Sequence, residues 1–204
     1  MARLNLSKSQ RWVRPLHTYS SMLMLFILLF FTITGVTLNN RHWLPQPAPP
    51  QEMELPLPEI WHNQLTLQAD KTRLSADLWR WLRQQEGLPD GEVSVDWPAD
   101  EPLLSLDIKR PGGYTLVEVD LEEAQIWYEH HRLGWWAVLN DLHMGRNSGQ
   151  LWSWFIDLSA LVMLLFTLTG LWLILFNPKR RRPSLALSGL GTLVMVGLYV
   201  WFLV

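Results

Sequence analysis

Long apolar segments alternate with a polar one along the chain. Residues 16–38, 151–176 and 185–204 are each mostly apolar and contain no Lys or Arg. A helix needs about 20 such residues to cross the hydrocarbon core of a bilayer, so each segment is long enough to span it. Residues 39–150, between the first two segments, are polar and patterned like a small folded domain. The pattern predicts a membrane α-helical bundle of three transmembrane helices, packed in membrane lipid, with one small folded domain between the first two helices.

Within the polar part, repeated prolines mark residues 39–60. Proline disfavours both helix interiors and sheet ladders, so we expect a stiff, extended connector here. Apolar residues at three- and four-residue spacing predict a helix over residues 67–87, with Gly87 as its stop signal. One helix over a small antiparallel sheet, an α+β domain at residues 61–131, is the expected fold class. Alternating apolar residues predict its strands at residues 92–97, 104–108, 114–120 and 124–129.

The orientation follows from basic residues. Lys and Arg gather before the first apolar segment and again in residues 179–182, and both groups belong on the cytoplasmic side of a bacterial inner membrane by the positive-inside rule. A signal peptide is the competing interpretation of the start, but the apolar run is too long and lacks a small-residue cleavage site, so we expect a retained anchor. The predicted order is cytoplasmic residues 1–15, transmembrane helix 16–38, connector 39–60, periplasmic domain 61–131, interfacial amphipathic segment 132–150, transmembrane helix 151–176, basic cytoplasmic loop 177–184 and transmembrane helix 185–204.

Charge is divided unevenly between the two predicted sides. Residues 39–151 contain 9 Lys and Arg against 18 Asp and Glu, a balance of −9, although the whole chain carries only −2. An acidic outer domain attracts cations and repels polyanions, which argues against nucleic acid as a partner. The absence of cysteine excludes disulfides, iron–sulfur clusters and covalent c-type haem. No G-x-G-x-x-G fingerprint for a nicotinamide or flavin cofactor is present.

His17 lies just inside the first apolar segment. An ionisable side chain at membrane depth is costly, so it normally faces protein, water or a cofactor. Further along, the windows LLFFTITGVTL and MLLFTLTGLWL look like copies. Either they form a weak inverted repeat, or they reflect the ordinary abundance of Thr and Gly in membrane helices. In both cases Gly35 and Gly170 mark a close approach, to another helix or to a flat cofactor.

His143 is the second histidine near a predicted membrane boundary. A short amphipathic helix over residues 133–144 would set it on the membrane surface, facing the spans. Neutral imidazole is a standard axial ligand of haem, and membrane helices supply the apolar packing that a non-covalent haem needs. For His17 and His143 the sequence leaves three interpretations open: haem ligation, a metal or proton role, and ordinary packing or interfacial hydrogen bonding.

Other polar residues near the predicted boundaries are secondary candidates. Met144 and His42 are reserve iron ligands, although a methionine here more often packs and a loop histidine is more often solvated. Arg14 and Arg146 are candidate partners for haem propionates because guanidinium grips carboxylates bidentately, while the positive-inside rule explains Arg14 equally well. Asp157 is the one acid in a predicted span, and it is either a hydrated interfacial carboxylate or a proton relay.

Two groups of motifs resemble a known family. A helix followed by strands ending in YTLVEVDLEEAQIWYEHH is similar to the PepSY module. The spans resemble those of PepSY-associated transmembrane proteins, but this chain has three spans where larger relatives have four or more, and His17 is displaced to five residues after Trp12. The matching residues are Arg11-Trp12, His17, Thr34-Gly35, Leu142-His143-Met144-Gly145-Arg146, Gly149, Trp152, Asp157-Leu158 and Thr169-Gly170-Leu171.

The resemblance implies a function. It indicates a haem-b inner-membrane protein of the ferric or ferrisiderophore reductase type, which passes electrons from quinol or a cytoplasmic donor to periplasmic ferric iron or a ferric chelate. The alternative, from a different class, is a non-catalytic module whose PepSY domain binds or regulates a periplasmic partner. His17 is expected near the inner surface and His143 near the outer one, so one chain is not expected to clamp a single haem between them. Two haems, or ligands shared across a homodimer, would satisfy both sites.

Overall fold

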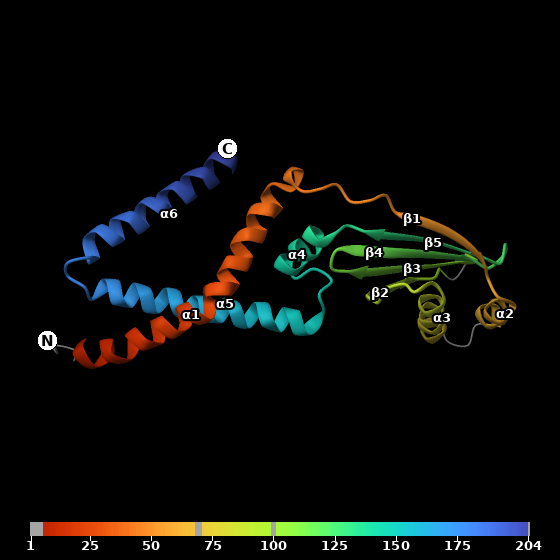
Figure 1. The fold of residues 1–204 in the computed structure, drawn as a ribbon, viewed down its shortest axis with the longest axis horizontal. Coiled ribbons are helices and arrows are strands. Elements are labelled where there is room, and N and C mark those ends of the chain that lie inside the picture. The colour runs from red at the N-terminus through yellow and green to blue at the C-terminus, as the bar shows by residue number, and fades with distance from the viewer. Residues whose placement is uncertain (1–5, 68–70, 99–100, 204) are drawn as a thin grey trace. The chain divides into compact units, whose positions relative to one another are not determined.

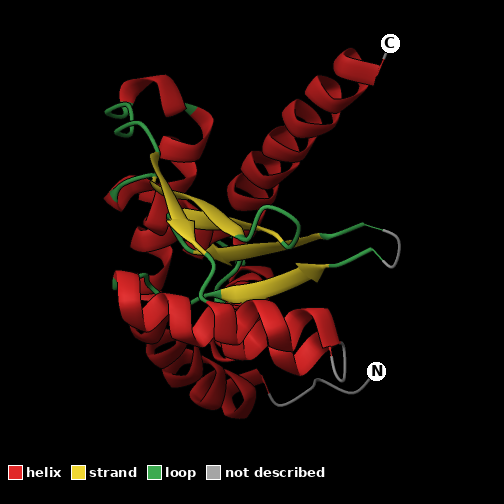
Figure 2. Cartoon of the chain, turned by 90° about the vertical axis from the view of Figure 1, so that its right-hand side faces the viewer, coloured by secondary structure: helices red, strands yellow, loops and turns green. Residues whose placement is uncertain are grey.

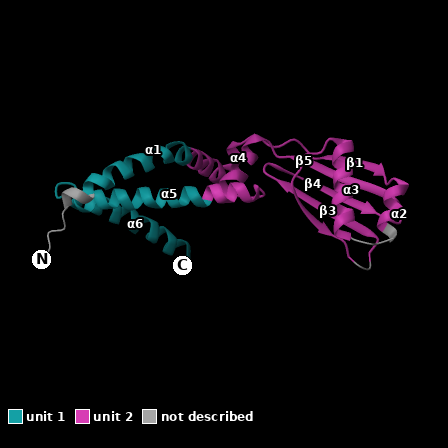
Figure 3. Cartoon of the chain, turned by 90° about the horizontal axis from the view of Figure 1, so that it is seen from below, with its two compact units in different colours: residues 1–29, 157–204 teal, residues 30–156 magenta. Residues whose placement is uncertain are grey.

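The computed structural model describes residues 6–67, 71–98 and 101–203 (Figure 1). The chain divides into two compact units (Figure 3). Unit 1 consists of residues 1–29 and 157–204, and unit 2 consists of residues 30–156. Each unit is described separately below.

Three helices are long and apolar enough to cross a membrane, which confirms the predicted transmembrane part. They are α1 (Leu6–Asn39), α5 (Gly149–Leu175) and α6 (Arg181–Leu203). α1 begins ten residues before the predicted span and runs through Pro15. α6 begins at Arg181, so part of the predicted basic loop is the first turn of the third helix. Many of their large apolar side chains are exposed in the isolated chain, as expected for helices whose solvent is lipid.

Unit 2 contains one antiparallel sheet of five strands in the order β1-β5-β4-β3-β2 (Figure 2). The three central strands follow one another along the chain and pair without a bulge from Leu103 to Arg132. This is a meander joined by tight turns, which the alternating pattern predicted. The strands are β1 (Gln51–Pro56), β2 (Glu92–Asp96), β3 (Leu103–Arg110), β4 (Gly113–Asp120) and β5 (Gln125–Arg132).

One face of the sheet is covered by the helices α2 (Glu59–Leu67) and α3 (Lys71–Glu86) (Figure 3). α3 contributes Leu78, Trp79 and Leu82 to a core whose other side is the alternate residues of the central strands. Leu104, Leu106 and Ile108 of β3 are at most 1% exposed, whereas their strand neighbours are partly exposed. The period-two burial confirms the α+β domain expected from the sequence.

The predicted connector over residues 39–60 is wrong in part, because Gln51–Pro56 forms strand β1. β1 pairs with β5 in register from Gln51 opposite His130 to Pro56 opposite Gln125. The prolines did not prevent this because they flank the strand, and its one proline sits at the end of an edge strand, where a missing N–H is tolerated. The earlier part of the connector holds the 3-10 turn η1 (Arg41–Trp43) and otherwise lacks regular structure.

The predicted helix over residues 67–87 is also corrected. Leu67 ends α2, a helix that the sequence analysis did not predict, and the main helix α3 covers Lys71–Glu86, while residues 68–70 lie outside the described residues. The predicted last strand over residues 124–129 runs on to Arg132 in β5. Pairing with β4 extends the strand, because every residue from Gly113 to Asp120 has a partner on β5.

Helix α4 (Trp135–Met144) supports the end of the sheet. The hairpin tip between β3 and β4 rests on it: Gly112 N–H donates to Asp141 Oδ2 at 2.8 Å, and a Cβ on Gly112 would lie 2.2 Å from Val138 Cγ2. Gly112 also has φ of +74°, so both its conformation and its close approach require glycine. α4 ends at Gly145, whose left-handed φ of 67° caps the helix.

Tyr128 should make the stability of this domain sensitive to alkaline pH. Its ring is 5% exposed, its hydroxyl donates to Glu86 Oε2 at 3.0 Å, and burial followed by this hydrogen bond raises the pKa of Tyr128 to about 12. Unfolded tyrosine titrates near 10, so the unfolded state loses its proton first and stability should fall as pH rises from about 10 to about 12. Tyr128→Phe should remove this loss in alkaline thermal melts monitored by circular dichroism, whereas Tyr19→Phe should leave it.

Candidate functional site

His17 of α1 packs its imidazole onto α5 within unit 1. The ring stacks on Phe166 with centroids 4.7 Å apart and an interplanar angle of 8°. Its Nδ1 lies 3.1 Å from the carbonyl oxygen of Phe166 and 3.0 Å from Thr169 Oγ1. A Cβ added to Gly170 would lie 3.0 Å from His17 Cε1. The glycine therefore lets the ring reach the surface of α5, and we call these four residues the His17 site.

His143 of α4 packs onto the last turns of α1 in the same way, within unit 2. Its ring meets Phe31 edge to face, with centroids 5.0 Å apart and an interplanar angle of 67°. Its Nδ1 lies 2.6 Å from Thr34 Oγ1. A Cβ added to Gly35 would lie 3.5 Å from His143 Cε1. These four residues form the His143 site, and in both sites the flat group against the glycine is an imidazole of the same chain.

The hydrogen bonds define which ring nitrogen carries the proton. Thr34 Oγ1 donates to the Phe30 carbonyl at 2.6 Å, so its oxygen can only accept from His143. The Phe166 carbonyl likewise can only accept from His17. Nδ1 is therefore the donor in both rings, which leaves the lone pair of the neutral imidazole on Nε2. In the described part of the chain, neither Nε2 has a hydrogen-bond partner.

The two sites occupy equivalent positions of the repeated sequence. Phe31, Thr34 and Gly35 correspond to Phe166, Thr169 and Gly170, in the spacing F-x-x-T-G. Each copy receives an imidazole in the same manner, through its threonine and over its glycine. This matched geometry favours the repeat over a chance abundance of threonine and glycine. The sequence showed the two similar windows, but it did not show that each window contacts one of the two histidines.

A second layer of polar contacts holds α4 against α1 and the start of α5. Thr37 Oγ1 donates to the side-chain oxygen of Asn140 at 2.8 Å, and Asn140 is 7% exposed. Trp152 Nε1 donates to the Leu142 carbonyl at 2.8 Å. The sequence analysis did not identify Thr37 or Asn140; the only signal was a polar side chain one turn after Thr34 for Thr37 and one turn before His143 for Asn140. These bonds fix the helix that carries His143.

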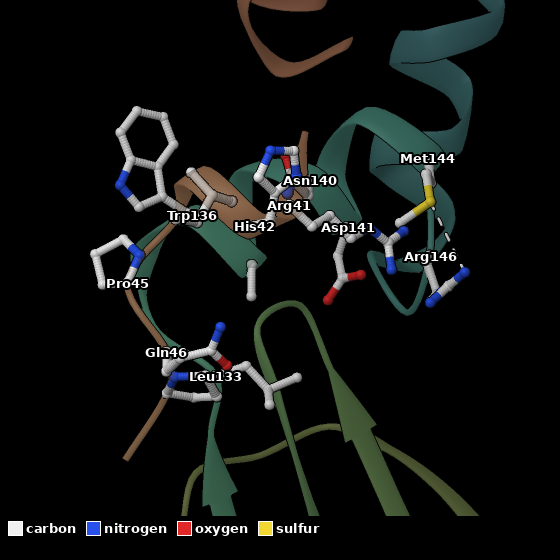
Figure 4. Close-up of a pocket in the computed structure, with 13 residues that line it drawn as sticks. Arg41, His42, Pro45, Gln46, Leu133, Trp136, Asn140, Asp141, Met144 and Arg146 are labelled. Atoms are coloured by element: carbon white, nitrogen blue, oxygen red, sulfur yellow. Dashed lines mark hydrogen bonds between the residues drawn. The ribbon is translucent and has the colours of Figure 1, made fainter. Parts of the chain in front are cut away.

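A cavity of about 430 Å³ lies beside α4 on the η1 side, and Figure 4 shows its lining. The predicted reserve ligands His42 and Met144 and the predicted propionate partner Arg146 all line it. Arg146 Nη2 lies 3.7 Å from Met144 Sδ, and Arg41 adds a further positive charge at the rim. Trp136, Pro45 and Leu133 form an apolar side, and Gln46 and Asp141 also line the cavity (Figure 4). The cavity thus combines guanidinium groups with an apolar wall.

Two further predicted residues, Arg14 and Asp157, are not among the residues that line this cavity. Arg14 and Asp157 are both exposed in the isolated chain. Neither forms an ion pair with any residue that the structure describes. Across residues 6–67, 71–98 and 101–203, no group of three or more His, Asp or Glu side chains is arranged to hold a metal ion. The propionate and proton-relay roles of these two residues stay predictions.

A comparison with known protein families identifies the family of this chain. A family model described as "Putative PepSY_TM-like" matches residues 9–204, which is nearly the whole chain. The chain belongs to the PepSY_TM-like family. The match covers all three membrane helices and the sheet, so this PepSY_TM-like protein carries the histidine sites and the sheet within the matched region. No curated protein and no solved structure matches the chain.

Proposed function

We propose that this PepSY_TM-like protein binds haem b without a covalent bond and transfers electrons through the membrane to ferric iron or a ferric chelate. The observation that carries the proposal is the pair of matched histidine sites. Each presents a neutral imidazole whose Nδ1–H is held by a threonine and whose Nε2 lone pair has no partner among the described residues.

The donor set fits haem. Histidines that ligate metals almost always donate their second ring N–H to a protein acceptor, which fixes the tautomer and raises the basicity of the ligating nitrogen. Thr34 and Thr169 supply that acceptor, and Phe31 and Phe166 pack against the rings. Bound haem would supply one-electron chemistry.

The chain's own residues then have defined roles. His17 and His143 are tied to different copies of the repeat, so each would ligate a separate haem, and a homodimer would supply the missing axial ligands. Arg14 and Arg146 would pair with propionates, Met144 and His42 stay reserve ligands, and Asp157 would relay a proton. Gly35 and Gly170 let the two ligands approach the spans. Quinol or a cytoplasmic protein would be the donor.

The acidic domain supports a cationic acceptor. The region between the first two spans carries 18 acids against 9 basic residues, so it raises the local concentration of ferric and ferrous ions by attraction. A ferric chelate with carboxylates would instead use the guanidinium groups around the cavity of Figure 4.

The test is the colour of the purified full-length protein. We expect a Soret band that shifts on dithionite reduction, with haem-to-protein stoichiometry near one per chain, because each haem would take one imidazole from each of two protomers. His17→Ala and His143→Ala should each remove about half of the haem, while His131→Ala, on the sheet, should remove none. Colourless protein, or equal haem in all three variants, would contradict the proposal.

The second candidate function is a non-catalytic module, and the edge strand β2 favours it. All five residues of Glu92–Asp96 are exposed, including Val93 at 37% and Val95 at 40%. An exposed edge with apolar side chains is a template for strand addition by a partner protein. Colourless protein that retains one specific extracytoplasmic partner, and loses it on Val95→Lys, would favour this function.

A further inference from the structure

Arg110 and Arg132 meet at the end of the sheet that continues into α4. Arg110 ends β3, Arg132 ends β5, and both pair in register with Gly113 of β4, one from each side. They lie on the same face of the sheet as Ile108 and His130. Gly113 has no side chain between them, and Arg110 Nη2 is 3.5 Å from the position that a Cβ would take there. The register thus brings two guanidinium groups together over a glycine.

No anion balances these charges. Neither arginine forms an ion pair with a carboxylate in the described residues. Burial, followed by the charge of Arg132, lowers the pKa of Arg110. His130 is 5% exposed, and its Nε2 accepts from Arg132 Nε at 3.3 Å, so Nδ1 of the neutral ring donates to Thr115 Oγ1 at 2.9 Å. Burial, followed by the charge of Arg110, lowers the pKa of His130, which disfavours a third positive charge here. Two like charges held this closely destabilise the empty site.

Two donors near this pair lack acceptors. Arg110 Nε and Ser148 Oγ are both buried atoms without a hydrogen-bond partner in the part of the chain that is described. Both residues line one cavity of about 650 Å³, together with Asn147. Buried donors without partners are rare because each costs roughly 1–3 kcal/mol. Because both residues line the cavity, an anion bound there would lie beside both side chains.

The carboxylates near the cavity do not accept hydrogen bonds from Arg110 Nε or Ser148 Oγ. Asp90 and Glu92 also line this cavity. Asp90 is held by an ion pair with Arg83, and that hydrogen bond lowers the pKa of Asp90. Asp141 is held by Gly112 at 2.8 Å. Arg110 is therefore the one cation in the described lining of the cavity, and no described carboxylate forms an ion pair with it.

We propose that this cavity binds a phosphate oxyanion through Arg110 and Ser148, while Arg132, which lines a different cavity, adds positive charge on the other side of Gly113. Guanidinium and hydroxyl groups match the several acceptor oxygens of phosphate. Ser148 comes directly before α5, a membrane-spanning helix, so the cavity lies at the depth where lipid headgroups carry phosphate. The source of the phosphate is either a lipid headgroup or the free ion. The site is independent of haem binding.

The experiment measures thermal unfolding of the full-length protein under paired conditions. In neutral detergent, sodium phosphate is compared with sodium chloride at equal ionic strength. In nanodiscs, phosphatidylglycerol mixed with a neutral glycolipid is compared with the neutral glycolipid alone. Arg110→Gln and Ser148→Ala are the test variants. Lys109→Gln is the matched control, because Lys109 is the neighbouring cation on the opposite face of β3.

A midpoint raised by several degrees with sodium phosphate, lost in both test variants and kept in the control, supports a free phosphate ligand. A midpoint raised only by the phospholipid, with the same pattern of loss, supports a lipid headgroup. We also expect Arg110→Gln to be at least as stable as the native protein without phosphate, because it relieves the charge repulsion. Equal shifts in Arg110→Gln, Ser148→Ala and Lys109→Gln, or no shift with either source, would overturn the proposal. Ser148→Ala decides the outcome if the arginine variant does not fold.

Discussion

Gly170→Leu should expel the His17 ring from α5 and lower the stability of the membrane helices. Even a Cβ at this position would lie 3.0 Å from His17 Cε1, and a leucine fills the space that the ring occupies. Forcing extra atoms into a packed contact typically costs about 1–3 kcal/mol. The ring would also lose its bonds to Thr169 and to the Phe166 carbonyl. We expect a lower thermal midpoint in detergent and, if haem is bound, loss of the share that depends on His17.

The matched control for this variant is Gly189→Leu. Gly189 lies in α6, another membrane helix, and no atom lies within 4 Å of the position of its Cβ. The same substitution there adds the same side chain without displacing a neighbour. Equal midpoints for the two variants would show that the contact between His17 and Gly170 contributes nothing to the packing of the helices.

Leu106→Ala should cost about 2–5 kcal/mol of folding free energy in the sheet domain, because it leaves a cavity at the centre of the core. Leu106 is 1% exposed and pairs with Val117, which is also 1% exposed. The loss should appear as a downward shift of the domain's unfolding transition in urea, monitored by tryptophan fluorescence. The helices of the membrane part should keep their circular dichroism signal in the same range of urea.

Leu103→Ala serves as the control on the same strand. Leu103 is an odd number of residues from Leu106, so its side chain points to the opposite, uncovered face, where it is only partly buried. We expect the loss at Leu103 to be clearly smaller than the loss at Leu106. Comparable losses would mean that the uncovered face of the sheet is packed against something as tightly as the core.

The three histidine-related positions differ in how far the sequence predicted them. His17 stood out because an ionisable residue in an apolar segment is costly and needs a partner. Gly35 and Gly170 stood out as parts of a repeat. The contacts of His17 with Gly170 and of His143 with Gly35 were not predictable, because His143 and Gly35, for example, are 108 positions apart and only helix packing brings them together. The sequence therefore identified the members of both sites but not their pairing.

In the connector, the sequence predicted the wrong local structure for one segment. Proline content predicted extended, unpaired chain over residues 39–60, yet Gln51–Pro56 is a strand of the sheet. A strand needs a partner with free N–H and C=O groups, and β5 provides one from Gln125 to His130. The prediction failed because the local conformational preference of the prolines does not reveal that the edge of β5 lies next to this segment in the fold.

By itself, the sequence determined the three membrane helices, the acidic domain between the first two, and the alternation that forms the central strands. These follow from hydrophobic length and period, which act over a few residues and need no knowledge of distant contacts. Only the tertiary structure decided that β1 completes the sheet, that each imidazole donates to a threonine of the repeat, and that Arg110 faces Arg132 across Gly113. Those features depend on strand register and helix packing, which join residues far apart in the chain and leave no local pattern to read.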